Sequence, residues 1–411
     1  MSKKIWLIQT GERLPLSSDI RKMRTALLAE AFVQTGATVS WFTSNFCHYN
    51  KEFLKDTEIE EFNNKSSYNI IAIPALGYRT NISIRRFLDH YYVSKSFTKL
   101  AAKQARPDII VCATPDHRLA YECFCYARDR GIEFCLDLRD LWPWDIINNF
   151  SGFKKFILEK LMLNDTRIAK ETIRNADVLI TMMRSWESFI YSEIGRKREI
   201  RDACFYLGAD TTKSEISLDG KFQNRLSDIK NCGPIITYIG AFNNKYTPYD
   251  LINYANDYPD QNLQVVLGGS GDHLDKCKQL ASNNPRVHFL GYLSQSEITY
   301  LLKQSSAAFL GANGTFPALP NKLYTYLSEG LPIITNMNGE LLDILNDLEI
   351  GFRYSDLASL SDAINQARAC TTQIRANAKS FFQEHLDATT TYRKMANHIL
   401  HNHYPTKKEI I

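Results

Sequence analysis

Two carboxylates and one arginine follow directly after an apolar stretch in the first half of the chain. Asp137, Arg139 and Asp140 come after residues 133–136, which have the length and composition of a buried strand. Polar groups at the carboxyl end of a parallel strand are placed to contact a ligand. Asp137 and Asp140 could act as a base or a polarising charge, with Arg139 as the counter-ion that keeps one of them ionised. A structural interpretation, a salt-bridged strand end that caps a helix, fits the same residues.

Other polar and aromatic residues follow further predicted strands in this half. Trp142 lies just beyond Asp140 and offers a ring face for stacking. His117, Asn81 and Arg24 each lie in or near a loop that follows an earlier predicted strand. We interpret them as candidate ligand contacts, and for Arg24 a surface salt bridge is the alternative.

The later half contains a loop that runs into a predicted helix. Residues 314–320 hold one Gly and two Pro, which forbid a regular element, and the apolar spacing from Asn321 to Leu327 is helical. Gly330 suits the end of that helix. The start of such a helix presents unpaired N–H groups and a positive dipole end, which bind anions such as phosphate, and Lys322 adds a mobile charge. An ordinary helix with a solvated lysine is the alternative.

Glycines follow two predicted strands in the same half. Gly240 begins a loop that reaches Lys245, and Gly269 lies in the run Gly268–Gly271. Because glycine has no side chain, these loops would let a ligand approach the backbone closely. The run does not match the six-residue dinucleotide fingerprint and lies mid-chain, which argues against a redox enzyme. Glu340, after a further strand, could accept hydrogen bonds from hydroxyl groups or cap the next helix.

A parallel sheet in each half would bring these residues together. The first strand, loop, helix and second strand form a βαβ unit, and the alternation restarts after a polar, unpatterned segment at 211–231. The predicted strands are 5–9, 39–42, 68–74, 108–113, 133–136, 176–181, 234–239, 263–267, 287–290, 307–310 and 333–336. The predicted fold class is therefore α/β, with two Rossmann-like, doubly wound parallel-sheet domains.

The predicted domains are 1–211 and 212–380, with a helix at 381–411 that packs back on the first domain. If the two sheets face each other, their ligand loops would meet across a cleft. The first domain would supply the carboxylates and the second the anion site. A phosphorylated donor on one side and an acceptor on the other is the economical arrangement.

Composition excludes several classes of protein. The 411 residues are 44% hydrophobic and 23% charged, as in globular proteins, and no apolar run approaches the roughly 18 residues that span a bilayer. The apolar part of the N-terminus is too short for a signal peptide. Nine cysteines without metal-clamp spacing indicate structural thiols in a reducing cytoplasm. A net charge of +4 permits contact with an anionic membrane or a nucleotide.

Two basic helices that carry aromatic residues are predicted at 84–103 and 150–163. A helix of this kind can lie on an anionic bilayer. Packing on its own domain, with a solvated basic face, is the alternative for each.

Four segments together resemble a known family. They are Asp137–Pro143, Gly268–Gly271, Phe289–Tyr292 and Asn321–Pro332. In their order and rough spacing they resemble a GT-B glycosyltransferase of family 4, the group 1 type. The WbuB-like branch of bacterial O-antigen and capsule clusters is the nearest match, and the resemblance covers nearly the whole chain.

The resemblance implies retaining, metal-independent transfer of a hexosyl or N-acetylhexosaminyl group from a nucleotide sugar, usually a UDP-sugar, without a cofactor. Cationic and backbone donors would replace the metal at the leaving diphosphate. The second domain would bind this donor, and the first would bind a polyprenyl-diphosphate-linked oligosaccharide acceptor. The protein would be cytoplasmic, at the cytoplasmic face of the inner membrane with peripheral lipid contact, and would bind no nucleic acid.

The resemblance also implies roles for individual residues. The implied donor-binding residues are Gly11, Gly240, Lys245, Gly269, Tyr292, Leu293, Asn321, Lys322 and Glu340. The implied acceptor-side residues are Arg24, Asn81, His117 and Trp142. The implied catalytic residues are Asp137, Asp140 and Arg139.

The chain departs from the family at the helix that begins with Asn321. Many members carry two glutamates eight positions apart there, and Pro317 and Thr325 occupy those positions in this chain. A non-catalytic GT-B-fold scaffold of a polysaccharide assembly complex is therefore one alternative function. A GT-B-fold epimerase or phosphorylase is another.

Overall fold

The chain forms two compact units in the computed structural model. The first comprises Met1–Gly208 with Ala388–Ile411, and the second Ala209–Asp387. The structure describes residues 2–17, 20–80, 83–210, 218–258, 262–282, 284–313, 319–369 and 372–401. The sequence placed the boundaries at 211 and 380. The second boundary lies later in the structure because helical turns of the second unit continue through Phe382–Leu386.

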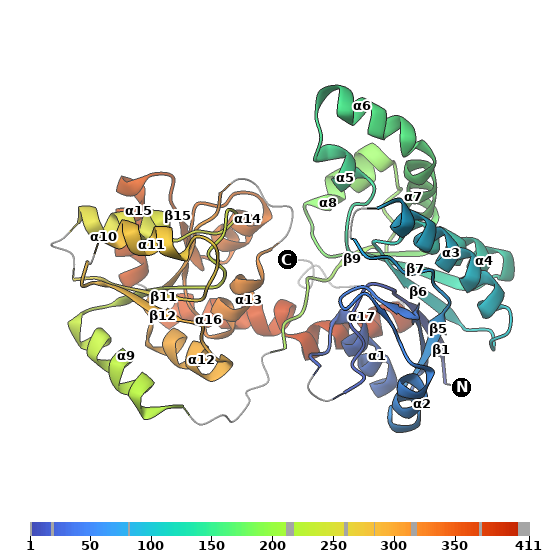
Figure 1. The fold of residues 1–411 in the computed structure, drawn as a ribbon, viewed down its shortest axis with the longest axis horizontal. Coiled ribbons are helices and arrows are strands. Elements are labelled where there is room, and N and C mark those ends of the chain that lie inside the picture. The colour runs from blue at the N-terminus through green and yellow to red at the C-terminus, as the bar shows by residue number, and fades with distance from the viewer. Residues whose placement is uncertain are drawn as a thin grey trace. The chain divides into compact units, whose positions relative to one another are not determined.

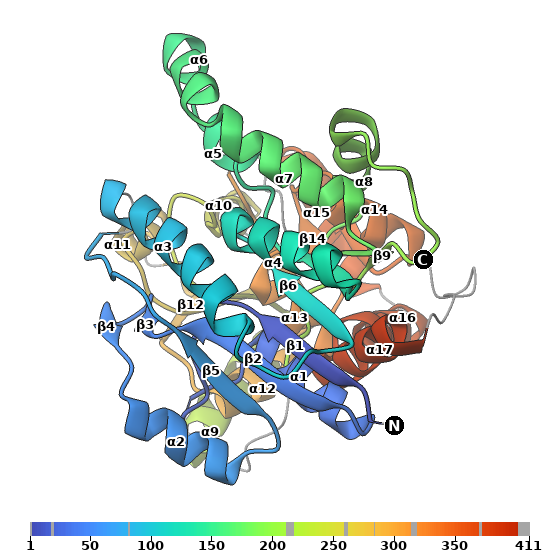
Figure 2. The same ribbon diagram turned by 90° about the vertical axis from the view of Figure 1, so that its right-hand side faces the viewer.

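The first unit is built on a seven-stranded parallel sheet (Figures 1 and 2). In spatial order its strands are β5 (Asn69–Ile73), β2 (Thr38–Ser44), β1 (Lys4–Ile8), β6 (Ile109–Ala113), β7 (Glu133–Leu138), β8 (Val178–Thr181) and β9 (Ala203–Cys204). A short antiparallel pair, β3 (Phe46–Cys47) and β4 (Glu52–Phe53), follows β2.

The helices of the first unit are α1 (Arg24–Gln34), α2 (Asp56–Lys65), α3 (Ile84–Ala101), α4 (His117–Arg130), α5 (Trp144–Asn148), α6 (Gly152–Leu161), α7 (Leu163–Asn175), α8 (Trp186–Ser188), the π-helix η1 (Phe189–Ile194) and α17 (Ala388–His401). Alternation along the central strands assigns these helices to two faces of the sheet. Leu7 and Trp41 share one core with α1 and α17. On the other face Trp6 and Phe42 contact Phe97 of α3.

The second unit repeats the architecture with six parallel strands. In spatial order these are β12 (Val287–Gly291), β11 (Gln264–Gly268), β10 (Ile235–Ile239), β13 (Ala307–Leu310), β14 (Ile333–Thr335) and β15 (Gly351–Arg353). Its helices are α9 (Gly220–Cys232), α10 (Tyr249–Asp257), α11 (Leu274–Ala281), α12 (Gln295–Gln304), α13 (Asn321–Ser328), α14 (Glu340–Asp347), α15 (Leu357–Arg368), α16 (Thr372–Phe381) and the π-helix η2 (Phe382–Leu386). Helices cover both faces of this sheet as well (Figure 1). The predicted fold class, two doubly wound α/β domains, is confirmed.

Strand order reverses once in each sheet, between β1 and β6 in the first unit and between β10 and β13 in the second. At such a point the loops from neighbouring strands leave in opposite directions. A crevice therefore opens at the carboxyl ends, where open α/β sheets bind their ligands. The two reversal points define where each unit is best placed to hold a ligand.

The terminal helix α17 is part of the first unit. Tyr392 and Met395 are fully buried in its core, and Tyr392 Oη accepts a hydrogen bond of 2.9 Å from Gly208 N. A Cβ atom on Gly208 would lie 2.7 Å from Ala388 Cα. The segment that leaves this unit and the segment that returns to it are thus packed side by side, and Gly208 makes that approach sterically feasible.

Three details differ from the sequence prediction. The predicted helix at 150–163 is broken at Met162, so that α6 and α7 form separate helices. The short strands β3, β4, β9 and β15 were not predicted, since two or three residues give too little alternation to detect. Among the described residues, no helix is long and apolar enough to cross a membrane.

Candidate functional site

Asp137 ends β7 inside a buried ion-pair network. Its carboxylate has no exposed surface. Oδ1 accepts a hydrogen bond of 2.8 Å from Arg24 Nη2, and Oδ2 accepts bonds of 3.1 Å from Arg24 Nε and 2.8 Å from Arg139 Nε. Burial raises the pKa of Asp137, but Arg139 and Arg24 outweigh it, so that the pKa lies below its usual range. Arg139 is therefore a counter-ion of Asp137 in this structure.

The partners of this network tie three elements of the first unit together. Arg139 also pairs with Glu12 and donates a 3.0 Å hydrogen bond to Thr25 Oγ1 of α1. Arg24 reaches the carbonyl oxygens of Phe205 and Tyr206 at 3.1 and 3.2 Å. The network is therefore the salt-bridged strand end that the sequence allowed as an alternative. In this structure Asp137 and Arg24 are buried and fully engaged, which leaves them no surface for a substrate.

Asp140, three residues later, lies in a different environment. It is only partly buried, and its backbone N–H lies 3.3 Å from Thr114 Oγ1. Burial and the nearby Asp145 carboxylate raise the pKa of Asp140 to about 6, while Arg139 lowers it less. A carboxylate with a pKa near neutral and some exposed surface fits the requirements of a proton acceptor better than Asp137 does.

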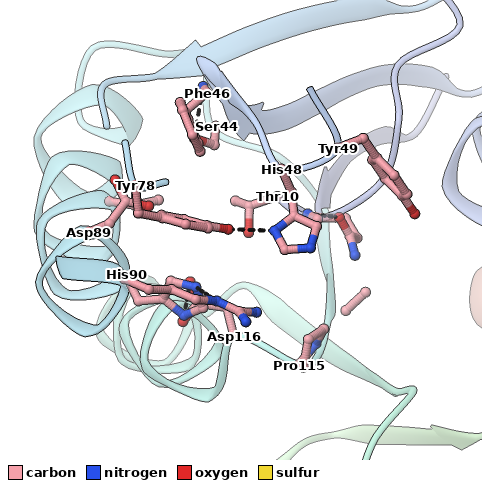
Figure 3. A pocket seen from close by; sticks show the side chains of 15 residues that line it. Thr10, Ser44, Phe46, His48, Tyr49, Tyr78, Asp89, His90, Pro115 and Asp116 are labelled. Carbon is pink, nitrogen blue, oxygen red and sulfur yellow. Dashed lines mark hydrogen bonds and ion pairs between the residues drawn. The ribbon is translucent and has the colours of Figure 1, made fainter. Parts of the chain in front are cut away.

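A polar pocket of about 220 Å³ lies at the reversal point between β1 and β6 (Figure 3). Gln9, Thr10 and Gly11 line it after β1, Ser44 at the end of β2, and Pro115 and Asp116 after β6. This is the position in which Gly11 was predicted to contact a ligand.

The remaining walls of this pocket come from residues that the sequence did not single out as a set. His48 and Tyr78 point toward each other, with 2.6 Å between His48 Nδ1 and Tyr78 Oη (Figure 3). His90 Nδ1 lies 3.6 Å from Asp116 Oδ2, and Arg86 of α3 also lines the pocket. Burial, followed by the charges of Lys51, Arg86 and His90, lowers the pKa of His48. His48 is therefore neutral near pH 7, and the pocket offers both hydrogen-bond donors and acceptors, as a polyhydroxylated ligand requires.

His117 and Trp142 lie beside this pocket and not in it. They line a larger, mostly apolar groove between α3 and α6, where their rings are 6.3 Å apart. His117 is buried, and its Nε2 is 2.7 Å from Asp165 Oδ1. The fourth predicted acceptor-side residue, Asn81, lies outside the described residues.

In the second unit, α13 begins at Asn321 as predicted and ends before Gly330, whose φ is +72°. Tyr326 of α13 joins the helix to the end of β10, because its hydroxyl accepts a 2.8 Å bond from Ile239 N and donates a 3.2 Å bond to Ile239 O. One helical turn earlier, Lys322 lies on the same face. The helix thus positions Lys322 over the start of the Gly240 loop at the reversal point between β10 and β13.

Lys322 is a buried cation among aromatic rings. Its Nζ lies 4.0 Å from the ring centre of Tyr238 and 4.5 Å from that of Tyr246. Within the described residues, which exclude 314–318, this nitrogen is buried and has no hydrogen-bond partner. The ring faces favour the charged form, but burial lowers the pKa of Lys322 to about 7. An ammonium group buried without an anion marks a place where an anionic ligand would be strongly favoured.

The packing of the backbone explains why Gly269 and Gly271 are glycines. A Cβ atom on Gly269 would lie 1.9 Å from Gly240 O, and one on Gly271 would lie 2.3 Å from Phe242 O. These residues also have positive φ values, +134° and +144°. They are required because the loops after β10 and β11 pack against each other. That glycine here also lets a ligand approach the backbone stays a prediction. At Gly240 a Cβ would instead lie 3.1 Å from Lys322 Nζ.

The other predicted donor-side residues differ in how accessible they are. Asn321 and Lys245 are exposed, and Tyr292 has 86% of its surface exposed. Leu293 is buried in the core beneath α9 and α12, so that its side chain is not available to a nucleotide base. Glu340 is buried at the first turn of α14.

Metal ligands do not gather anywhere in the described part of the chain. No group of three or more His, Cys, Asp or Glu residues there could hold a metal ion. The eight cysteines whose positions are described are all free thiols.

The second unit matches a known family. Residues 221–380 match the family described as Glycosyl transferases group 1. This segment contains β10 to β14, the Gly240 loop and α13. No curated protein matches the chain.

Solved structures of similar fold cover nearly the whole chain. A sucrose-phosphate synthase from Thermosynechococcus elongatus is 14% identical with a TM-score of 0.63, and covers 96% of this chain and 98% of its own. Anabaena HepE in complex with UDP is 12% identical with a TM-score of 0.61, and covers 97% and 99%. WaaG, a glycosyltransferase involved in lipopolysaccharide biosynthesis, is 13% identical with a TM-score of 0.58, and covers 97% and 100%. Together with the two parallel-sheet units, these likenesses show that the fold is GT-B.

Proposed function

We propose that the protein is a retaining glycosyltransferase that moves a sugar from a nucleotide sugar, UDP-linked, to a lipid-linked oligosaccharide in surface polysaccharide biosynthesis. The observation that carries the proposal is the buried ammonium group of Lys322 at the β10–β13 reversal point. Its place in the part of the chain that matches the glycosyltransferase family supports the same conclusion.

The surroundings of Lys322 fit the diphosphate of a nucleotide sugar. Among the described residues no side chain caps the start of α13, and Leu323 N donates to Pro320 O at 2.9 Å. The N–H groups before Leu323 are where an anion would bind. A bound diphosphate would hold Lys322 in its protonated form, and burial makes each electrostatic contact of that charge stronger than in water. Lys245 in the Gly240 loop is exposed at the same end of the sheet and supplies a second cation.

The proposed reaction depends on the positive charge of Lys322 most strongly when the bond to the leaving group breaks. As the bond between the sugar carbon and the diphosphate oxygen breaks, negative charge grows on the leaving diphosphate. Fixed N–H groups and an ammonium aimed at that charge lower the barrier without needing to reorganise. The acceptor hydroxyl forms the new bond to the sugar carbon and loses its proton, and Asp140, with its pKa of about 6, remains the candidate base.

The solved structures support the choice of donor. HepE is described in complexes with UDP, with UDP and glucose, and with UDP-glucose, and a trehalose-6-phosphate protein from E. coli was bound with UDP-2-fluoro glucose. A lipid-linked acceptor is supported by the exposed apolar residues of α3 and α6, which include Phe87, Leu88, Phe153 and Leu161. Such residues also favour peripheral contact with the cytoplasmic face of a membrane.

Titration calorimetry with UDP tests the donor site. We expect the full chain to bind UDP, and Lys322→Met to weaken binding roughly ten- to a hundredfold, because a charge-assisted phosphate contact contributes about 1.5–3 kcal/mol. Lys303→Met, on the exposed face of α12, is the matched control and should bind UDP like the wild type. Absence of binding by any nucleoside diphosphate would overturn the proposal.

A panel of UDP-sugars, with released UDP as the readout, separates an enzyme from a scaffold. Turnover with any donor in the presence of a lipid-linked acceptor fits a transferase. The scaffold alternative, which rests on Pro317 and Thr325, predicts instead that polymer production in cells survives Lys322→Met. Loss of polymer with a normally folded Lys322→Met protein would exclude that alternative.

A further inference from the structure

We propose that the apolar groove of the first unit binds the hydrocarbon chain of a single phosphorylated lipid, with the phosphate at its inner end beside Arg86 and Arg118. The inference deepens the proposed function and rests on it, because it states where and how a lipid-linked acceptor would be held. Its evidence is the shape, lining and charge of the groove, all within one unit.

The groove is large and its walls are mostly hydrocarbon. Its volume is about 780 Å³, within the range of roughly 300–1,000 Å³ typical of small-molecule sites. The apolar lining residues are Phe87 of α3, Trp142, Ile146 of α5, Phe150, Ile157, Leu158 and Leu161 of α6, and Met162. Leu161 has 74% of its surface exposed, and α6 buries none of its residues. An apolar surface of this kind is unfavourable in water unless something covers it.

Positive charge is concentrated at the end of the groove where α3, α4 and α7 meet. Arg86 and Arg118 line this end, together with His90 and His117. Two acids lie close to these side chains: Asp165, which is engaged by Arg118 at 2.7 and 3.0 Å and by His117 at 2.7 Å, and Asp116, which lies 3.6 Å from His90. Burial raises the pKa of Asp165, but its bonds to His117 and Arg118 lower it to about 2, so that Asp165 stays ionised and neutralises one cation only.

His117 provides a second indication that this end receives a ligand. Its side chain is 5% exposed, and within the described residues its Nδ1 is buried without a hydrogen-bond partner. Buried ring nitrogens are normally paired, because an unpaired one costs free energy. A polar group of a ligand at the inner end of the groove would supply the partner that this nitrogen lacks.

The groove and the polar pocket of Figure 3 share two residues. Arg86 and His90 line both, so the apolar groove lies on one side of them and the polar pocket, with His48, Tyr78 and Asp116, on the other. The lining is mostly apolar in the groove, where Asn149 and Lys154 are polar exceptions, and polar in the pocket, and Arg86 and His90 belong to both. An amphiphile with a hydrocarbon chain, a phosphate linker and a sugar has the same order, which fixes the direction in which it would lie.

A concave groove with a charged inner end fits one chain better than it fits a bilayer surface. A flat membrane covers the outward side of a helix, and α6 has apolar residues there as well, Phe153 and Phe156, which lie outside the lining of the groove. Substitutions on the two sides of α6 therefore distinguish a single bound lipid from docking on a membrane. Groove residues matter for a single lipid, whereas the outward residues matter for membrane docking.

The test measures binding of dimethylallyl, geranyl and farnesyl monophosphate to the full chain by titration calorimetry below their critical micelle concentrations. We expect affinity to rise at least tenfold for each added five-carbon unit, because each buried methylene contributes to binding. Farnesol should bind at least tenfold more weakly than farnesyl phosphate, and Arg86→Ala should remove most of that difference. Equal affinity across the series, or equal binding of inorganic phosphate, would overturn the proposal.

Matched substitutions on α6 locate the chain. Leu161→Ser is expected to weaken farnesyl phosphate binding about tenfold. Phe153→Ser, at a position exposed to almost the same extent (76% against 74%), is expected to leave it unchanged. In a second pair, Ile157→Ser changes a groove residue and is expected to weaken binding. Phe156→Ser changes an outward residue and is expected to leave binding unchanged. Because none of the four residues is buried, with exposed fractions from 42% to 76%, these variants should fold normally. Loss confined to Phe153→Ser and Phe156→Ser, seen also with phosphatidylglycerol vesicles, would replace the single-lipid site by membrane docking.

UDP binding to the same samples separates this inference from the proposed function. The groove variants should bind UDP like the wild type, since UDP belongs to the second unit. A chain that binds UDP and turns over a donor but binds no prenyl phosphate would overturn the inference and leave the transferase standing. A chain that binds prenyl phosphates with the stated pattern but no nucleotide would support the groove and overturn the transferase.

Discussion

Two buried charged sites lie at the carboxyl ends of strands, one in each unit, and they are opposites. At the end of β7, Asp137 is enclosed by the guanidinium groups of Arg24 and Arg139, and every charge has a partner. At the start of α13, Lys322 is enclosed by the rings of Tyr238 and Tyr246, and its nitrogen has no hydrogen-bond partner among the described residues. Only the second site is incomplete without a ligand.

The difference shows why charge at a strand end is not in itself evidence of catalysis. A matched network stabilises the unit it belongs to, and removal of one member leaves the others buried and unpaired. An unmatched cation lowers the stability of the free protein and is retained where binding of an anion compensates for it. Substitutions should therefore lower stability at the first site and raise it at the second.

The largest effect is expected from Asp137→Asn. Loss of the negative charge would leave Arg24 and Arg139 buried together, and we expect the free energy of unfolding of the first unit to fall by about 3–5 kcal/mol. Hydrogen exchange followed by mass spectrometry measures this in peptides from β1 and β7, with peptides from β10 and β11 as the internal control. Unchanged protection of β1 and β7, together with loss of transferase activity, would instead return Asp137 to a catalytic role.

Substitution of Lys322 is expected to have the opposite effect and to raise the free energy of unfolding of the second unit. The pKa is about 7 in the folded chain against 10.5 in an unfolded one, so that below pH 7 both states hold the proton and the folded state bears the full cost. Lys322→Met should therefore stabilise the second unit at pH 6 by on the order of 2 kcal/mol. The gain should shrink as pH rises from 7 toward 10.5, because the wild-type lysine then folds in its neutral form. Hydrogen exchange in β10 at pH 6 and pH 9 measures the gain in stability and its decrease with pH. A Lys322→Met variant less stable than the wild type at pH 6 would contradict the prediction.

The affinity for UDP should depend on pH through the same titration of Lys322, and this effect should be smaller. A diphosphate favours the charged lysine, so that the complex takes up a proton wherever the free protein has lost it. We expect affinity to vary little through Lys322 between pH 6 and 7, and to fall by up to tenfold per pH unit above 7. Calorimetry in two buffers of different ionisation enthalpy detects the proton uptake at pH 8. Lys322→Met should abolish it, whereas uptake that persists in this variant would assign the proton to another group.

The sequence predicts the sheets well because their signals are local. The strand predicted at 234–239 is Ile235–Ile239 in the structure, and the helix predicted from Asn321 begins there. Both depend on apolar spacing and on Gly or Pro within a few residues. The polar pocket at the β1–β6 reversal point could be foreseen in part, through Gly11. His48 and Tyr78 could not, because they lie in irregular segments without periodicity.

The roles of charged residues depend on partners that are remote in sequence. Asp137 was predicted to be a catalytic group, and its partner Arg24 lies 113 positions earlier. Lys322 was expected to be mobile, and the rings that bury it belong to β10 and the loop that follows it. Spacing within one element carries no information about such pairings. The same holds for the apolar groove, whose lining comes from α3 to α7, including the break at Met162 that separates α6 from α7.

Substitution of Asp140 is expected to have the smallest effect on stability, and it gives the most specific check of the site at the end of β7. Burial and Asp145 raise its pKa to about 6, so that the folded state holds its proton more tightly than the unfolded state, and stability contributed by this group is lost as pH rises from about 4 through 6. Asp140→Asn should therefore leave the first unit as stable as the wild type below pH 4, and slightly more stable at pH 7, by less than about 1 kcal/mol after allowance for solvent. If Asp140 is also the base, turnover falls by roughly a hundredfold or more while UDP affinity stays the same. A variant that loses stability as Asp137→Asn does would place Asp140 in the buried network, and one that keeps full turnover would leave the reaction without a base from this strand end.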